Sequence, residues 1–105
     1  MTRIDFEFAV PAGHPSLTGH FPGNPVVPGV LVLDCVMDAL HRAGGMQVVH
    51  LQRVKFVSAL RPGETAQGCW EVEGTRAAFR VTADRGGAAA RVAEGVCLLT
   101  ARGAA

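Results

Sequence analysis

The amino-acid sequence predicts an α+β fold in which an antiparallel, curved sheet wraps around one central, buried helix. Three observations lead to this prediction. Residues 30–43 form one apolar run of helical length, and the segments around it alternate apolar and polar side chains as half-buried strands do. A chain of 105 residues can enclose a helix that is apolar nearly all round only if a sheet curls over it. We expect a single domain that spans residues 1–105.

The first expected strand covers residues 3–10, where apolar side chains at even positions alternate with polar ones. Residues 11–29 follow as a long loop of proline, glycine and small polar residues without periodicity. A loop of this length in a compact domain is usually functional or disordered, and its prolines favour an ordered one. The helix over residues 30–43 should then end at Gly44 and Gly45.

Four antiparallel strands are expected after the helix, separated by turns rich in glycine. Their expected bounds are residues 46–59, 65–73, 76–83 and 88–100. In the last of them, the even-numbered side chains from Ala90 to Thr100 should share one face of the sheet. A sheet of this kind has free edges, and 105 residues leave the helix incompletely covered, so a second subunit is the expected cover.

Composition and charge exclude several classes of function. The chain carries ten basic and nine acidic residues, a net charge of +1, and no cluster of basic side chains, so nucleic acid is not an expected partner. No apolar run reaches the length of about 18 residues that a membrane-spanning helix needs. The spacing of histidines and cysteines matches no metal site. Cys35, Cys69 and Cys97 lie in apolar surroundings and follow no signal peptide, which predicts three reduced core thiols in a cytosolic protein.

Residues 20–34 are the stretch that points to chemistry. His20 opens a segment stiffened by three prolines, and Gly29 then allows the chain to turn into the helix. Asp34 lies inside the apolar run, where burial of a carboxylate costs several kcal/mol unless a partner or a function offsets it. Judged alone, His20 could be a loop histidine that only packs, and Asp34 could be a buried acid bonded to backbone N–H groups.

The same stretch resembles the active-site motif of a known family. Residues 20–34 read HFPGNPVVPGVLVLD, which is similar to the motif of the hot-dog-fold 3-hydroxyacyl-acyl-carrier-protein dehydratases of bacterial type II fatty acid synthesis. A weaker similarity continues to the Pro-Gly-acid turn at residues 62–64. The short form of the motif looks most like stand-alone dehydratases of aryl-polyene and related pigment pathways.

The resemblance implies a fold, a reaction and a set of site residues. It implies a homodimer or a dimer-based higher oligomer, in which His20 of one chain faces Asp34 of the other. His20 suits the general base and Asp34 the acid that protonates the leaving hydroxyl, since desolvation in an apolar helix should raise the pKa of Asp34. The backbone N–H of Gly29, with Val30 beside it at the helix start, would bind the thioester oxygen. The residues expected to line the acyl pocket are Phe21, Val26, Val27, Val30 and Leu33.

The expected partner is an acyl carrier protein with a phosphopantetheine-linked acyl chain, and no cofactor is expected. Two departures from the family pattern matter. The helix acid is aspartate, as in the dehydratase–isomerase branch, although the loop looks more like the dehydratase-only branch. Asp38 stands where the family commonly has glutamine, so it could couple to the titration of Asp34. Two alternatives stay open, namely thioester hydrolysis on the same fold and a non-catalytic subunit that binds an acyl carrier.

Overall fold

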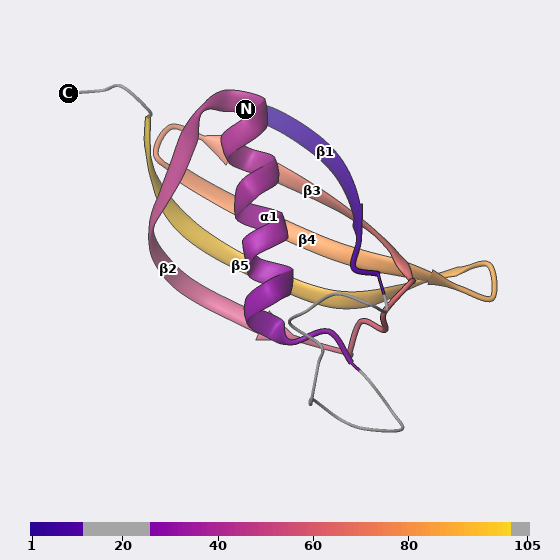
Figure 1. The fold of residues 1–105 in the computed structure, drawn as a ribbon. Coiled ribbons are helices and arrows are strands. Elements are labelled where there is room, and N and C mark those ends of the chain that lie inside the picture. The colour runs from indigo at the N-terminus through magenta and orange to yellow at the C-terminus, as the bar shows by residue number, and fades with distance from the viewer. Residues whose placement is uncertain (12–25, 102–105) are drawn as a thin grey trace.

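The computed structural model describes residues 1–11 and 26–101, and these residues form one curved sheet and one helix (Figure 1). The described elements are β1 (Thr2–Ala9), α1 (Gly29–Gly44), β2 (Met46–Phe56), β3 (Thr65–Glu73), β4 (Arg76–Arg85) and β5 (Ala88–Ala101). The strands make an antiparallel sheet in the order β1-β3-β4-β5-β2. The predicted α+β architecture, a sheet curled around one helix, is confirmed.

The central strands alternate buried and exposed residues, as the sequence predicts. In β4 the side chains of Ala77, Phe79 and Val81 are buried on the side of the helix, and the residues between them are exposed. Phe79 packs against Trp70 of β3, with ring centroids 5.2 Å apart and ring planes inclined by 54°. This aromatic pair lies in the middle of the core that the sheet and the helix share.

Helix α1 begins after Pro28 and ends where the chain requires a left-handed residue. Gly45 adopts φ 67° and ψ 13°, and its N–H donates to the carbonyl of His41 at 2.8 Å. Glycine takes this conformation without steric cost, which explains why the helix stops at the predicted Gly44–Gly45 pair.

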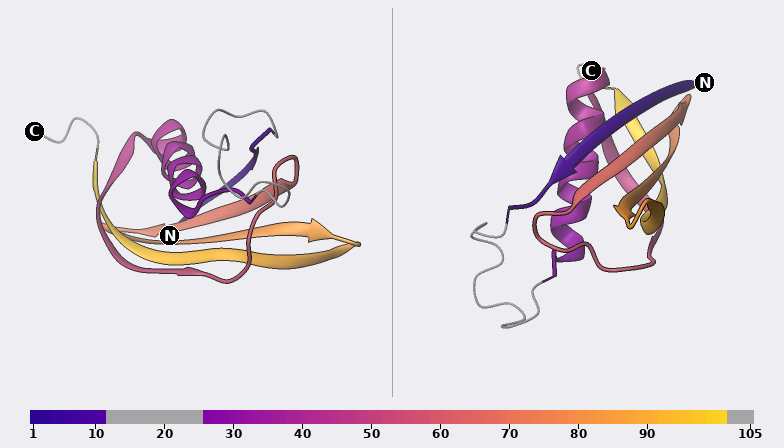
Figure 2. Two further views of the ribbon diagram at one scale, coloured as in Figure 1. Left: turned by 60° about the horizontal axis from the view of Figure 1, so that its bottom comes forward. Right: turned by 90° about the vertical axis from the view of Figure 1, so that its right-hand side faces the viewer.

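Only one face of α1 is buried in the single chain. Val32, Val36 and Leu40 are buried against the sheet, and the indole N–H of Trp70 donates to the carbonyl of Val36 at 2.8 Å. The opposite stripe is exposed, and it consists of Val30, Asp34, Asp38 and Arg42. The prediction that α1 is buried on most sides is therefore wrong for the single chain, because the helix lies across the concave side of the sheet and nothing in the described chain covers its outer side (Figure 2).

The strand β5 also departs from the predicted pattern. The register of β4 and β5 shifts between Val81 and Thr82, so that Val92 and Ala93 are both buried. After this bulge the odd-numbered residues Cys97 and Leu99 point to the core, whereas the sequence placed even-numbered residues on one common face.

Two smaller expectations also change. Strand β2 ends at Phe56 rather than at residue 59, because the N–H groups of Val57 and Ser58 both donate to the carbonyl of Val92 and the chain leaves the sheet edge.

The three cysteines are free, but only Cys97 is buried. Cys35 and Cys69 are half-buried, so the prediction of three core thiols is wrong for these two. No helix among residues 1–11 and 26–101 is long and apolar enough to cross a membrane.

Candidate active-site pocket

An apolar pocket of about 480 Å³ lies between the start of α1 and the end of β2. Its walls come from the segment that enters the helix, from the residues after β2, and from the bulge of β5. The lining residues are Val27, Gly29, Val32, Phe56, Val57, Ser58, Ala59, Leu60 and Val92. Because all but one of these residues lack a polar side chain, the pocket suits a ligand with a hydrocarbon part.

Backbone hydrogen bonds fix the two walls of the pocket to each other. The N–H of Val27 donates to the carbonyl of Leu60 at 2.7 Å, which joins the helix entry to the segment after β2. The N–H groups of Leu31 and Val32 both donate to the carbonyl of Pro28, at 3.0 and 3.2 Å. The first two helical residues, Gly29 among them, have no acceptor within the helix, so their N–H groups can serve a ligand.

Gly29 and Phe56 are in direct contact at one side of this pocket. A Cβ atom placed on Gly29 would lie 2.8 Å from Cζ, 3.0 Å from Cε1 and 3.2 Å from Cε2 of Phe56. These three atoms are the tip of the ring, so Phe56 points end-on at the position where any other residue would carry its side chain. The pocket thus needs glycine at position 29 as long as Phe56 keeps this place.

An ion pair from the β4–β5 hairpin holds the segment after β2. Arg85 donates two hydrogen bonds to Glu64, Nε to Oε2 and Nη2 to Oε1, both at 2.9 Å. Its guanidinium also donates to the carbonyl of Ala59 and to the hydroxyl of Ser58, two residues that line the pocket. The N–H of Arg61 donates to Oε1 of Glu64 at 2.7 Å.

This network has an electrostatic signature. The Arg85 guanidinium, together with the N–H of Arg61, holds the pKa of Glu64 at about 2, below its ordinary value. Both side chains of the pair are largely covered, with 28% of Arg85 and 20% of Glu64 exposed. The wall of the pocket is therefore tied to the sheet by a charged clamp rather than by apolar packing alone.

The structure separates the residues that the sequence assigned to the site. His20 and Phe21 lie outside the described residues. Val27 and Gly29 both line the pocket, while Val26 is half-buried and does not line it. Leu33 is half-buried and packs against the core.

Two further site residues lie on the outer stripe of α1. The side chain of Val30 is 69% exposed and does not line the pocket. Asp34 is exposed as well, so its predicted burial is wrong for the single chain, because it lies opposite the face that packs on the sheet. One turn further, Oδ2 of Asp38 lies 2.8 Å from Nε of Arg42 in an ion pair, so the second carboxylate of the helix already has a cationic partner.

Sequence reasoning missed most of the pocket wall after β2. Phe56, Val57, Leu60 and Val92 line the pocket, and the sequence assigned none of them to it. Phe56 comes six residues before Pro62 of the Pro-Gly turn, but the pattern gives no signal that the tip of its ring packs against a glycine 27 positions earlier in the chain. Among the described residues, no group of three or more histidine, cysteine or acidic side chains could hold a metal ion.

Comparison with known proteins shows the family of this chain. The model of the ApeI-like family, described as ApeI dehydratase, matches residues 1–95. The chain belongs to the ApeI-like dehydratase family. Members of this kind share the hot-dog fold, and the structure of the dehydratase heterocomplex ApeI:P from Xenorhabdus doucetiae superposes with a TM-score of 0.77 at 25% identity, covering 92% of this chain and 86% of that one.

The chain also resembles proteins described under other names. The 3-hydroxyacyl-acyl-carrier-protein dehydratase FabZ of Oenococcus oeni is 40% identical over 60 residues, which cover 45% of this chain and 40% of the relative. The chain thus spans less than half the length of this relative. An acyl-CoA hydrolase of Staphylococcus aureus superposes with a TM-score of 0.73 at 14% identity, over 94% of this chain and 64% of that one, and this likeness shows the fold alone.

Proposed function

We propose that this chain dehydrates 3-hydroxyacyl thioesters carried by an acyl carrier protein and produces trans-2-enoyl thioesters. The observation that carries the proposal is the apolar pocket that opens at Gly29, at the start of α1, in a chain of the ApeI-like dehydratase family. A pocket of about 480 Å³ has the size of a small-molecule site, and the helix start next to it offers backbone N–H groups to a carbonyl oxygen. The proposed location is the cytoplasm, where type II fatty acid or aryl-polyene synthesis supplies such thioesters.

In the proposed mechanism His20 removes the proton from Cα of the substrate. The electron pair of that C–H bond forms the Cα=Cβ double bond, and the C–O bond at Cβ breaks. Asp34 gives its proton to the leaving hydroxyl, which departs as water. The N–H of Gly29 donates to the thioester oxygen, where negative charge grows during proton removal, and such donors are commonly worth about 3 to 4 kcal/mol. No step of this scheme uses a cofactor.

The position of Asp34 requires a second chain in this proposal. Among the described residues, the exposed large hydrophobic side chains other than Met1 gather on one side. They lie on the outer side of α1, on β2 or directly after β2, and they are Val30, Val49, Leu51, Phe56 and Val57. Strand β2 is also an edge of the sheet, and an edge with apolar side chains is a surface for pairing. We propose that a second copy covers this side and brings its His20 to Asp34.

The ApeI of Xenorhabdus doucetiae is described in a heterocomplex, so a different hot-dog chain is the rival for that place. The mass of the purified chain in solution separates the two partners. A dimer of the chain alone supports the proposed homodimer, whereas a monomer that becomes active only with a second hot-dog protein contradicts it.

The test of the site is the rate of dehydration of a 3-hydroxyacyl carrier protein. His20→Ala and Asp34→Asn should each lower kcat by about 10² to 10⁴, the usual contribution of a general acid or base. Asp38→Asn is the matched control, because Asp38 lies one turn along the same exposed stripe and already pairs with Arg42, and it should keep most of the activity. Wild-type rates in both single variants would refute the assigned roles.

The shared site can be tested by mixing inactive chains. If one chain gives His20 and the other gives Asp34, a mixture of His20→Ala and Asp34→Asn chains contains heterodimers with one intact site, and about a quarter of the wild-type sites return. No recovery on mixing would contradict a site built from two chains. A thiol-trapping reagent in the same assay detects hydrolysis, and release of free thiol in place of enoyl product would support the thioesterase alternative. Carrier binding without either product would support the non-catalytic alternative.

A further inference from the structure

Among the described residues, Phe56 is the largest side chain at the Gly29 end of the pocket. The buried lining residues Val27, Val32, Leu60 and Val92 form its inner part. Phe56 lines the same pocket but is 50% exposed, so its ring forms part of the rim. Val57 also lines the pocket and is 45% exposed, but its side chain is smaller, so Phe56 has the larger effect on how much of a ligand can enter.

The contact between Phe56 and Gly29 determines which part of a ligand the ring restricts. The tip of the Phe56 ring lies 2.8 to 3.2 Å from the position that a Cβ on residue 29 would take, so it packs against the backbone that would bind the thioester oxygen in the proposed function. Atoms of the substrate next to that carbonyl must therefore pass the ring. The part of the substrate that lies there is the acyl chain, because the carrier arm must extend to solvent.

The other residues of the pocket wall are held in place, so the side chain of residue 56 is the part of the wall that can change the space open to a ligand. Ser58 and Ala59 are held by the Arg85 guanidinium, and Leu60 is held by the N–H of Val27 at 2.7 Å. These positions are fixed by hydrogen bonds to two other elements of the fold. The ring of Phe56 has no such tie among the described contacts, and half-exposed aromatic side chains change rotamer easily.

We propose that Phe56 determines the acyl-chain selectivity of this pocket, with its ring limiting the length and bulk of the acyl group that can lie beside Gly29. This inference rests on the proposed function, since it names the residue that selects among the substrates of that site. It predicts that a smaller residue at position 56 favours longer acyl chains and that a larger one favours shorter chains.

The experiment compares Phe56→Ala and Phe56→Trp with the wild type on straight-chain 3-hydroxyacyl-pantetheine thioesters from butyryl to dodecanoyl. Differences of one or a few methylene groups in an apolar pocket commonly change kcat/KM by about tenfold or more. We expect the ratio of kcat/KM for the longest substrate over that for the shortest to rise about tenfold in Phe56→Ala and to fall in Phe56→Trp. Val96→Ala is the matched control, because Val96 is a half-buried apolar residue of the neighbouring strand β5 outside this pocket, and it should leave the ratio unchanged.

Binding is measured in parallel, so that the inference stays testable if turnover is absent. The probes are saturated acyl-pantetheine amides of the same lengths, and their Kd values are determined by calorimetry on proteins whose mass and circular dichroism match the wild type. If Phe56→Ala does not fold, Phe56→Leu replaces it. If the chain length that binds most tightly changes with residue 56 but no variant dehydrates its substrate, this inference is upheld and the proposed function is refuted. Dehydration with the same length profile in all variants overturns the inference and leaves the proposed function intact.

Discussion

Removal of the Arg85 guanidinium is the change whose effect on the fold can be worked out most fully. Arg85→Ala takes away two charge-assisted hydrogen bonds to Glu64 and leaves the carbonyl of Ala59 and the hydroxyl of Ser58 without this donor. Exposed ion pairs contribute about 0 to 1 kcal/mol, and breaking a fully buried pair costs about 3 to 5 kcal/mol. The pair here is between these limits, with 28% and 20% of its side chains exposed, so we expect a loss of about 2 kcal/mol in the free energy of unfolding.

The assay is urea and thermal unfolding at a fixed protomer concentration, because association would otherwise shift the midpoint. A loss of about 2 kcal/mol corresponds to a fall in Tm of about 8 to 16 °C for a domain of this size. A double-mutant cycle with Glu64→Gln isolates the pair, and a coupling energy of about 1 to 2 kcal/mol is expected. A coupling energy near zero would refute the reasoning that the pair, rather than general packing, holds this segment.

The same pair predicts how stability depends on pH. The pKa of Glu64 is about 2 in the folded chain and near 4.5 when the carboxyl is unperturbed. The stabilisation is therefore fully present above about pH 4.5 and is lost as the pH falls towards 2, because the unfolded chain binds the proton first. Stability curves of the wild type and of Glu64→Gln should converge as the pH falls through this range, and parallel curves would contradict the assignment.

Three other changes test the packing described above. Gly29→Ala should lower kcat/KM by about tenfold, because its Cβ would meet the ring tip of Phe56 at 2.8 Å, and adding Phe56→Leu should restore part of the loss. Gly95→Ala should destabilise the fold by about 2 kcal/mol or more in urea, because the new Cβ would lie 2.7 Å from the backbone oxygen of Arg53, and a backbone atom cannot rotate away. A thiol reagent at neutral pH should modify the half-buried Cys69 faster than Cys97, because full burial raises the pKa of Cys97 to about 11, and Cys35 should also react slowly because partial burial and then the nearby Asp34 and Asp38 raise its pKa; mass spectrometry of the labelled peptides would show the difference.

Local signals in the sequence were sufficient for the elements and their order. The apolar run of the helix ends at a glycine pair that the structure uses as a left-handed stop, and the strands follow from alternation between glycine turns. The bulge at Val92 was not predictable, because the alternation continues through it in the sequence while the pairing with β4 shifts. The pairing of β1 with β3 also lies beyond local patterns, since the helix and β2 come between these strands in the chain.

The candidate site shows the same limit. The motif residues Val27 and Gly29 do line a pocket, but its other wall comes from residues 56–60, and only the fold brings the two segments together. Hydropathy alone placed Asp34 in a buried environment, because the residues on both sides of it are apolar. In the structure Leu33 and Cys35 are half-buried at the sides of the helix and Asp34 lies on its exposed stripe, because successive residues are about 100° apart around the helix axis.

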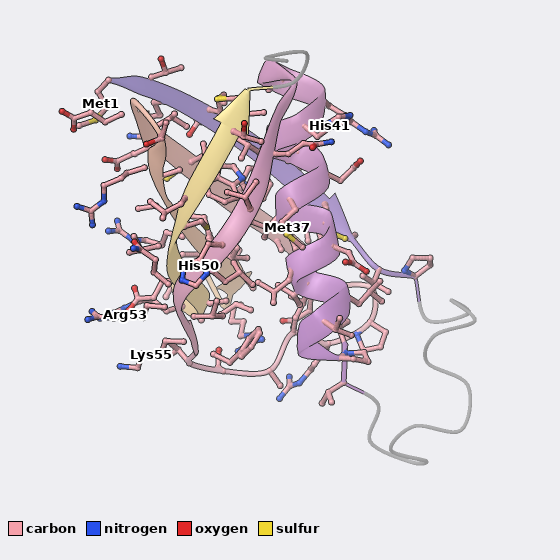
Figure 3. The ribbon with its side chains drawn as sticks, turned by 90° about the vertical axis from the view of Figure 1, so that its left-hand side faces the viewer. Met1, Met37, His41, His50, Arg53 and Lys55 are labelled. Atoms are coloured by element: carbon pink, nitrogen blue, oxygen red, sulfur yellow. The ribbon has the colours of Figure 1, made fainter. Side chains whose placement is uncertain are left out.

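The edge strand β2 carries exposed polar and charged side chains in addition to its exposed apolar ones. Figure 3 shows His50, Arg53 and Lys55 on β2, and all three side chains are exposed. Charged residues on an exposed edge discourage open-ended stacking of strands, while the apolar residues between them still allow one defined pairing. The two kinds of residue together favour a closed assembly over a fibre.

The outward position of Asp34 has a consequence for how such an enzyme would behave on dilution. In the proposed site Asp34 works with the histidine of a second chain, so an isolated protomer, whose Asp34 faces solvent, would hold only half of each site and would be inactive however well folded it is. Specific activity would then depend on protein concentration, with a loss below the dissociation constant of the assembly and a recovery on reconcentration.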